Sequence, residues 1–125
     1  MKTVLFISSN KVLGQGLSVA IRAKRGFNFR WMARINYLQA AACVDIFHAD
    51  VVILDVVDQV DVELAVEICR SIRQNEQNIK ILLLVRPEQA VVRKVAVDTK
   101  NAGLADDFVF YDSSLTYLLA KLEAL

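Results

Sequence analysis

The fold is decided by one stretch, Asp50-Val51-Val52-Ile53-Leu54-Asp55-Val56. Its uninterrupted apolar run, residues 51–54, has the length of a strand, and residues 81–85 form a second run of the same kind. Neither run alternates apolar with polar residues, which predicts strands buried on both faces, as in parallel sheets covered by helices. Asp55 closes the first run, where a carboxylate is costly unless it reaches solvent or a partner.

Outward from this stretch, strand-sized apolar segments alternate with segments of helical spacing. Leu64, Ile68 and Ile72 recur at i, i+4 and i+8, which is typical of the buried face of a helix. Ser9 or Asn10 is expected to cap the first helix. We predict strands at 3–7, 27–35, 50–57, 79–85 and 107–111, and helices at 11–25, 36–48, 62–75, 88–101 and 114–125.

The regular order of strand and helix predicts an α/β fold with a doubly wound, five-stranded parallel sheet. Helices of crossover length return the chain right-handedly, so they cover both faces and form a three-layer α/β/α sandwich, (βα)5. The 125 residues contain no repeats or linkers. We therefore expect one domain, residues 1–125, to which an output domain can be joined in the native protein.

Composition narrows the class of protein. With 55% apolar residues and a mean hydropathy of +0.38, the chain is not intrinsically disordered, and no apolar run approaches the ~18–20 residues of a membrane span. A net charge of +1 gives no general electrostatic reason for binding nucleic acid or an anionic membrane. Because the start lacks a signal-peptide pattern, we expect a cytoplasmic protein, with Cys43 and Cys69 as buried free thiols.

Ligands of doubly wound sheets bind beyond the carboxyl ends of the strands, where the strand order reverses. The residues that follow the predicted strands are therefore the candidates for a site: Ser8, Ser9, Asn10, Asp55, Asp58, Asp61, Val85, Arg86, Tyr111 and Asp112. Asp55 stands out because it ends a fully apolar strand. It is either a solvated strand-end aspartate or a nucleophile or metal ligand, and the residues alone leave both interpretations open.

Four stretches together resemble the receiver domains of two-component response regulators, and the resemblance covers essentially the whole chain. They correspond to the phospho-acceptor strand, the third helix, the fourth strand and the turn into the fifth strand: residues 50–56, 65–73, 81–84 and 102–108, the last with one residue inserted. The resemblance implies the CheY-like variant of the flavodoxin-like fold. It places Asp55 at the phosphorylated aspartate and implies a signalling module rather than an enzyme.

At most of the functional positions of the family, this sequence has a residue of a different chemical type. The acidic pair that binds Mg²⁺ in receiver domains falls on Ser8 and Ser9, although Mg²⁺ prefers carboxylate oxygens to neutral hydroxyls. The strand-four Thr or Ser of the family falls on Val85, and the strand-five lysine that pairs with the phosphoryl group falls on Tyr111. The proline that follows the lysine falls on Asp112.

The aromatic switch position of the family falls on Phe108, which lacks a hydroxyl. Catalysis of phosphoryl transfer consists mostly of positioning and of charge neutralisation by a metal and by cations. We therefore predict that Asp55 is phosphorylated poorly or not at all, and that the site holds no metal or other cofactor. Arg86 in place of the lysine, and Asp58 or Asp61 as metal ligands, stay open as compensations.

These residues predict a degenerate receiver domain (a pseudo-receiver) that serves as a regulatory protein-interaction or dimerisation module in phosphorelay signal transduction. Its expected partner is a histidine kinase or a second copy, bound through the face of the fourth helix, fifth strand and fifth helix, where Val91, Val92, Val95 and Val97 favour an apolar strip. One alternative is a working Mg²⁺-dependent receiver with an unusual pocket. The other is a flavodoxin-like binder of a small ligand or anion at Ser8-Ser9-Asn10, because a helix N-terminus attracts anions.

Other patterns give little support to catalysis. His48, the only histidine, precedes the third predicted strand at the sheet edge opposite Asp55 and is expected at the surface or at a helix end. One histidine and two cysteines on different helices make no zinc pattern, and no Ser-His-Asp set can form across the sheet. Gly14-Gln15-Gly16 lies too far inside the first helix to be a phosphate loop.

Overall fold

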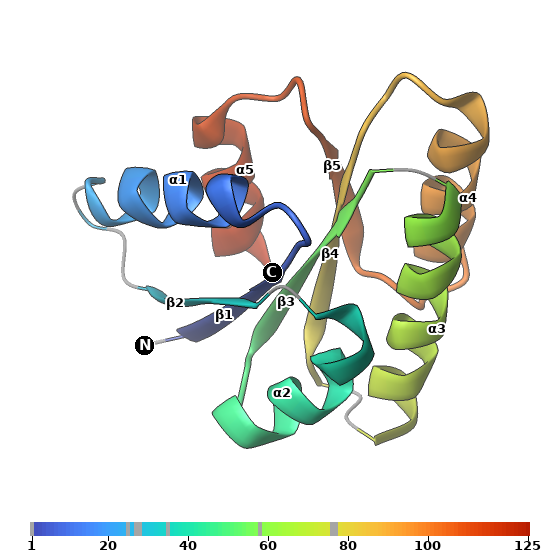
Figure 1. The fold of residues 1–125 in the computed structure, drawn as a ribbon, viewed down its shortest axis with the longest axis horizontal. Coiled ribbons are helices and arrows are strands. Elements are labelled where there is room, and N and C mark those ends of the chain that lie inside the picture. The colour runs from blue at the N-terminus through green and yellow to red at the C-terminus, as the bar shows by residue number, and fades with distance from the viewer. Residues whose placement is uncertain (1, 25, 27–28, 35, 58, 76–77) are drawn as a thin grey trace.

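The computed structural model describes residues 2–24, 26, 29–34, 36–57, 59–75 and 78–125. Its strands are β1 (Lys2–Ile7), β2 (Phe29–Arg34), β3 (Val51–Val56), β4 (Lys80–Val85) and β5 (Asp107–Phe110). Its helices are α1 (Lys11–Arg22), α2 (Ala40–Phe47), α3 (Gln59–Asn75), α4 (Ala90–Asn101) and α5 (Leu115–Ala124), with the 3-10 turn η1 (Tyr37–Gln39) before α2. Figure 1 shows a twisted central sheet with helices on both sides.

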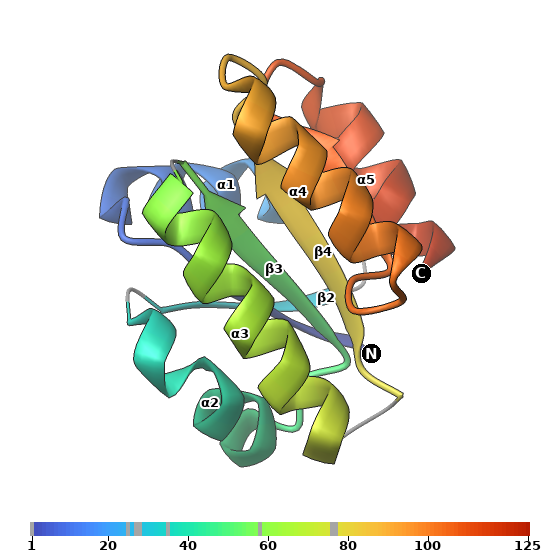
Figure 2. The ribbon, with the colours of Figure 1, turned by 90° about the vertical axis from the view of Figure 1, so that its right-hand side faces the viewer.

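The five strands are parallel and lie in the order β2-β1-β3-β4-β5. Helices α1 and α5 cover one face of the sheet, and α2, α3 and α4 cover the other (Figures 1 and 2). The predicted doubly wound α/β sandwich is therefore confirmed. From β1 the chain runs outward to β2 and then returns to β3 on the other side of β1, so the strand order reverses between β1 and β3. The carboxyl ends of these two strands are where such sheets bind ligands.

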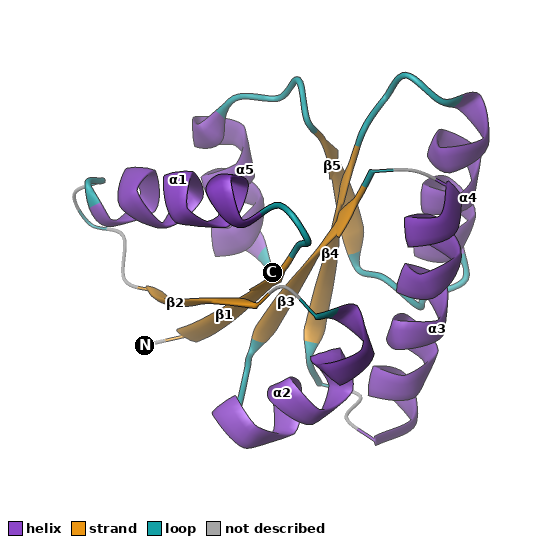
Figure 3. Cartoon of the chain, in the orientation of Figure 1, coloured by secondary structure: helices purple, strands orange, loops and turns teal. Residues whose placement is uncertain are grey.

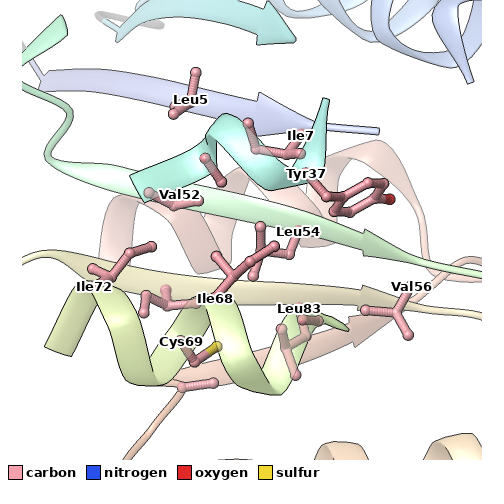
Figure 4. Packing of buried hydrophobic residues seen from close by; sticks show 14 of the residues in the cluster. Leu5, Ile7, Tyr37, Val52, Leu54, Val56, Ile68, Cys69, Ile72 and Leu83 are labelled. Carbon is pink, nitrogen blue, oxygen red and sulfur yellow. The ribbon is translucent and has the colours of Figure 1, made fainter. Parts of the chain in front are cut away.

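The apolar residues of β3 divide between two hydrophobic cores, because successive side chains of a strand point to opposite faces. Val52 and Leu54 pack with residues of α2, α3 and α4, whereas Ile53 belongs to the core beneath α1 and α5. Figure 4 shows Val52 and Leu54 among side chains from the neighbouring strands and α3. Cys43 and Cys69 are buried free thiols in this first core, as predicted, and burial raises the pKa of Cys69 to about 12.

The ends of α1 and β2 follow local signals. Asn10 rather than Ser9 caps α1, since its side-chain oxygen accepts a hydrogen bond from Leu13 N at 3.1 Å. The helix ends at Arg22, three residues before the predicted end, and residue 25 lies outside the described residues. In β2, Trp31 belongs to the core beneath α1 and α5, and the next residue packs against the opposite core, because successive side chains of a strand point to opposite faces. Residues 27, 28 and 35 of this predicted strand are also outside the described part.

The predicted helix over 36–48 begins differently. The Asn36 side chain accepts a hydrogen bond from Leu38 N at 3.0 Å, only two residues ahead, and this tight cap is followed by the 3-10 turn η1 rather than by α-helix. Helix α2 then runs to Phe47, and His48 ends it in the left-handed conformation with φ 52°. Elsewhere, α3 begins three residues before the predicted position and α4 two residues after it.

Candidate functional site

Asp55 lies at the carboxyl end of β3, and its side chain is fully buried at 0% exposure. It pairs with Leu84 in the register of β3 and β4, while β1 flanks β3 on the other side. Because parallel strands end at the same edge of a sheet, the loops after β1, β4 and β5 lie at the end where Asp55 is found (Figure 3). Asp55 is therefore not the solvated strand-end aspartate that was one of the two interpretations of the sequence.

Ser8 is the direct side-chain partner of Asp55. It follows β1, is 2% exposed, and donates a hydrogen bond from its hydroxyl to Asp55 Oδ2. Its Oγ also accepts a hydrogen bond from Asn10 N at 3.0 Å, and the Asn10 side chain caps α1. The side chains of Ser8 and Asn10 are thus already hydrogen-bonded within the chain, while Ser9 is exposed. This weakens the case for an anion site at these three positions.

The other carboxylate oxygen, Asp55 Oδ1, is buried without a hydrogen-bond partner among the described residues. Burial disfavours the charged form and raises the pKa of Asp55 to about 6, against the opposing effect of the hydrogen bond from Ser8. The negative charge of Asp61 adds to the increase in pKa, and the positive charge of Arg86 reduces it. Asp55 is therefore mostly charged at pH 7 and mostly neutral at pH 5.

Tyr37 holds the main chain of Asp55. This tyrosine lies on η1, is 7% exposed, and donates a hydrogen bond from its hydroxyl to the carbonyl oxygen of Asp55. Figure 4 shows its ring beside Ile7 of β1. Tyr37 was not among the sequence candidates, because a tyrosine in a crossover segment carries no pattern of its own. The only signal is the cap residue Asn36 directly before it.

Val85 and Tyr111 supply uncharged side chains at the same edge of the sheet. Val85 is the last residue of β4 and is fully buried, and its carbonyl accepts a hydrogen bond from Tyr111 N at 2.9 Å. The Tyr111 hydroxyl is buried and has no partner within the described ranges. The Arg86 guanidinium lies 5.2 Å from the centre of the Tyr111 ring, which is a cation–π distance. An aromatic ring thus holds this cation beside the site.

The described residues of this edge form no cluster of magnesium ligands. Mg²⁺ requires near-octahedral oxygen coordination that includes carboxylates, whereas the side chain bonded to Asp55 is the neutral hydroxyl of Ser8. Asp61 Oδ2 accepts a hydrogen bond from Val57 N at 3.2 Å, and Asp58 lies outside the described residues. Within the part of the chain that the structure describes, no group of three or more His, Cys, Asp and Glu could hold a metal.

The remaining candidates lie elsewhere. Phe108 is half-buried against the core beneath α2, α3 and α4, and its ring meets that of Phe110 edge to face at 5.4 Å between centroids. Lys100 Nζ lies 5.8 Å from the centre of the Phe108 ring. Asp112 is exposed. His48 is exposed at the C-terminus of α2, as the sequence predicted.

Comparisons with known proteins give these features a context. No protein-family model and no curated protein sequence matches the chain. Among solved structures, it is similar to a DNA-binding response regulator of the LuxR family from Staphylococcus aureus, with a TM-score of 0.77, 20% identity, and coverage of 99% of this chain and 98% of that one. HP1043, an orphan response regulator of H. pylori, gives a TM-score of 0.75 and 22% identity, with 98% of this chain and 94% of that chain covered. The receiver domain of Klebsiella pneumoniae RstA gives a TM-score of 0.77 and 17% identity, with 98% of this chain and 97% of that chain covered.

The chain has the fold of response-regulator receiver domains. At these identities the likeness concerns the fold, and the residues of the site carry the functional argument. In this receiver fold Ser8 contacts Asp55 directly, and Val85 and Tyr111 lie at the same sheet edge. Ser9 is exposed, and Phe108 packs against the core beneath α2, α3 and α4. None of the described helices is long and apolar enough to cross a bilayer.

Proposed function

We propose that this chain is an atypical receiver domain, a regulatory protein-interaction module in phosphorelay signalling whose Asp55 accepts a phosphoryl group poorly or not at all. In this proposal it acts in the cytoplasm and is not an enzyme. One observation carries the proposal. At a position that is acidic in the receiver family, Ser8 donates a hydrogen bond to a fully buried Asp55 instead of holding a metal beside it.

The lack of positive charge at the site supports the same proposal. Phosphoryl transfer depends on a metal and cations that neutralise the charge of the transferred group. Val85 offers hydrocarbon and Tyr111 a neutral phenol at positions where the family has a hydroxyl and a lysine. Arg86 affects the pKa of Asp55 but lies against the Tyr111 ring. A phosphoryl donor would therefore meet a buried carboxylate and little compensating charge.

The outer face of α4 favours a role in protein interaction. Of its valines, Val92 is fully buried, whereas Val91 and Val97 are 54% and 40% exposed. Tyr117 of α5 is 47% exposed. These apolar groups lie on the two helices that the resemblance assigns to the partner-binding face. A second copy of the chain or a histidine kinase is the partner we propose for it.

Ion pairs link the elements of this face to one another. Asp107 of β5 accepts from Lys100 of α4 at 3.2 Å and from Lys121 of α5 at 2.6 Å. Both carboxylate oxygens are used, so the strand and its two flanking helices are tied together. A preorganised surface loses less conformational entropy on binding than a mobile one. A strictly monomeric mass at high concentration, measured by light scattering, would count against the second copy as partner.

The phosphorylation half of the proposal is tested by incubating the domain with Mg²⁺ and acetyl phosphate and measuring its intact mass. We expect no addition of a phosphoryl group and no change in the NMR spectrum with beryllofluoride. The matched variant replaces four residues with the family's side chains: Ser8→Asp, Ser9→Asp, Val85→Thr and Tyr111→Lys. It should gain phosphorylation that is lost again with Asp55→Asn. Stoichiometric modification of the natural chain would instead establish a working receiver with an unusual pocket.

A further inference from the structure

A groove of about 730 Å³ lies between α1 and the adjacent side of β1 and β2, apart from the carboxylate of Asp55. Figure 1 shows α1 beside the edge of the sheet that β2 forms. Ser8 and Asn10 line one end of the groove. Neither the receiver resemblance nor the proposed function uses this space.

The floor of the groove is aromatic. Phe6 and Trp31 line it and stack on each other, with ring centroids 5.4 Å apart and an angle of 23° between the planes. Trp31 is 7% exposed, and its indole nitrogen is buried without a hydrogen-bond acceptor in the part of the chain that the structure describes. A buried N–H group without an acceptor is unfavourable. An acceptor atom of a ligand that reaches Trp31 would relieve this cost.

One wall of the groove is polar and positively charged. Lys11, Gln15, Ser18 and Arg22 line it from α1, and their spacing of i, i+4, i+7 and i+11 places them along one face of the helix. Arg34 also lines the groove, but its guanidinium lies 4.6 Å from the centre of the Phe47 ring. We therefore assign no ligand contact to Arg34. The described lining includes no Asp or Glu.

The charge of the surrounding segment strengthens this wall. The overall net charge of +1 conceals a strong asymmetry along the chain. Residues 1–44, which supply β1, α1 and β2, contain seven Lys or Arg and no Asp or Glu. Residues 45–125 contain eight Lys or Arg and fourteen Asp or Glu. The end of the molecule that carries the groove therefore attracts anions, which raises their local concentration.

We propose that the groove between α1 and β2 binds a small aromatic anion. A flat ring system packs over Trp31, the more exposed of the two floor rings, and a carboxylate, sulfonate or phosphate group faces the positively charged wall of α1. The aromatic floor and the lone indole N–H group favour a compact ligand with a ring over an extended polyanion, which would need cations alone. Such binding would give the domain an input that does not require phosphorylation of Asp55.

Trp31 is the only tryptophan of the chain, so all tryptophan emission comes from the floor of this groove. Three probes separate the contribution of the ring from that of the anionic group. They are 8-anilinonaphthalene-1-sulfonate, the neutral N-phenyl-1-naphthylamine, and inorganic phosphate. The sulfonate should quench Trp31 emission saturably with one site per chain. The neutral analogue should bind about threefold more weakly, because one exposed charge contact contributes roughly this factor. Phosphate alone should leave the emission unchanged.

Variants assign the binding to residues. The double variant Lys11→Gln/Arg22→Gln removes both cations of the α1 wall and should weaken sulfonate binding about threefold, whereas Lys94→Gln, on the exposed side of α4, changes a charge far from the groove and should have no effect. Trp31→Phe keeps an aromatic floor but removes the N–H group. Followed through the probe's own emission, it should bind about threefold more weakly.

Three results would overturn the proposal. They are equal affinity for the neutral analogue and the sulfonate, unchanged affinity in the Lys11→Gln/Arg22→Gln variant, and binding without quenching of Trp31. Two further results together would likewise assign the site to a general polyanion. They are displacement of the sulfonate by a DNA duplex and a loss of sulfonate affinity in the Lys94→Gln variant equal to that in the Lys11→Gln/Arg22→Gln variant. Because none of the variants alters Asp55, these outcomes are independent of whether it is phosphorylated.

Discussion

The hydroxyl of Ser8 donates a hydrogen bond to Asp55 Oδ2 and thereby joins the ends of β1 and β3, the two strands between which the sheet order reverses. An acidic side chain at position 8 would repel Asp55 unless a cation lay between them. A serine binds the aspartate without a metal. It satisfies one carboxylate oxygen, while Oδ1 stays without a partner in the described part of the chain. This half-satisfied carboxylate should make the stability of the domain depend on pH.

Replacing Asp55 by asparagine should stabilise the domain above pH 6. The pKa of Asp55 is about 6 in the folded state against an ordinary value of 3.8, so the folded state binds this proton more tightly than the unfolded state. The contribution of Asp55 to stability is therefore most favourable below pH 4 and is lost as the pH rises through 6. At pH 8 the loss amounts to at most about 3 kcal/mol.

Urea unfolding of the natural chain and the Asp55→Asn variant at pH 4, 6 and 8 measures this difference. We expect the two free energies of unfolding to diverge with rising pH, with the variant the more stable at pH 8. A variant that is less stable than the natural chain at pH 8 would contradict the burial of an incompletely bonded carboxylate.

Ser8→Ala should destabilise the domain by about 1–3 kcal/mol at pH 8, because it removes the only side-chain donor found for Asp55 among the described residues. The loss should shrink at pH 5, where Asp55 is mostly neutral and its desolvation costs less. Ser9→Ala is the matched control, since Ser9 is exposed, and it should change the stability by less than about 0.5 kcal/mol. Equal effects of the two substitutions would show that Ser8 has no special role.

Tyr37→Phe should cost about 1–2 kcal/mol, because it leaves the buried carbonyl of Asp55 without the hydroxyl donor and keeps the ring in place. Tyr117→Phe removes a hydroxyl from a side chain that is 47% exposed and should be nearly neutral. Thermal unfolding of both variants makes the comparison. A Tyr37→Phe variant as stable as the Tyr117→Phe variant would mean that the hydrogen bond to Asp55 contributes nothing.

Arg73→Lys should destabilise the domain by about 1–2 kcal/mol even though it keeps the positive charge. Arg73 donates to the carbonyls of Leu104 and Ile79 and to Asp106 Oδ2, the last at 2.7 Å, and a lysine cannot reproduce this planar fork. Arg70→Lys is the control, because the Arg70 side chain is 54% exposed in its ion pair and should contribute less than about 0.5 kcal/mol. Urea midpoints that do not separate the two variants would contradict this role of Arg73.

Contacts between residues far apart in the sequence mark the limit of prediction from the sequence. The residues that follow the strands indicated that Ser8 and Asp55 lie at one edge of the sheet, because parallel strands end together. They did not indicate that Ser8 donates to Asp55, since this depends on how closely β1 and β3 approach and on the rotamer of Ser8. Tyr37 was missed for a related reason: its hydroxyl reaches Asp55 only because a 3-10 turn replaces the first turn of the predicted helix.

By itself, the sequence determined the order of strands and helices, the two-sided burial of β3 and the uncharged residues Ser8 and Ser9 after β1. These features are local, because apolar spacing, caps and residue identity act within a few neighbouring positions. Only the tertiary structure decided that Asp55 is closed off from solvent and that its partner is a hydroxyl 47 residues away. It also decided that Trp31 forms the floor of a positively lined groove, because the packing of α1 against β1 and β2 creates that space.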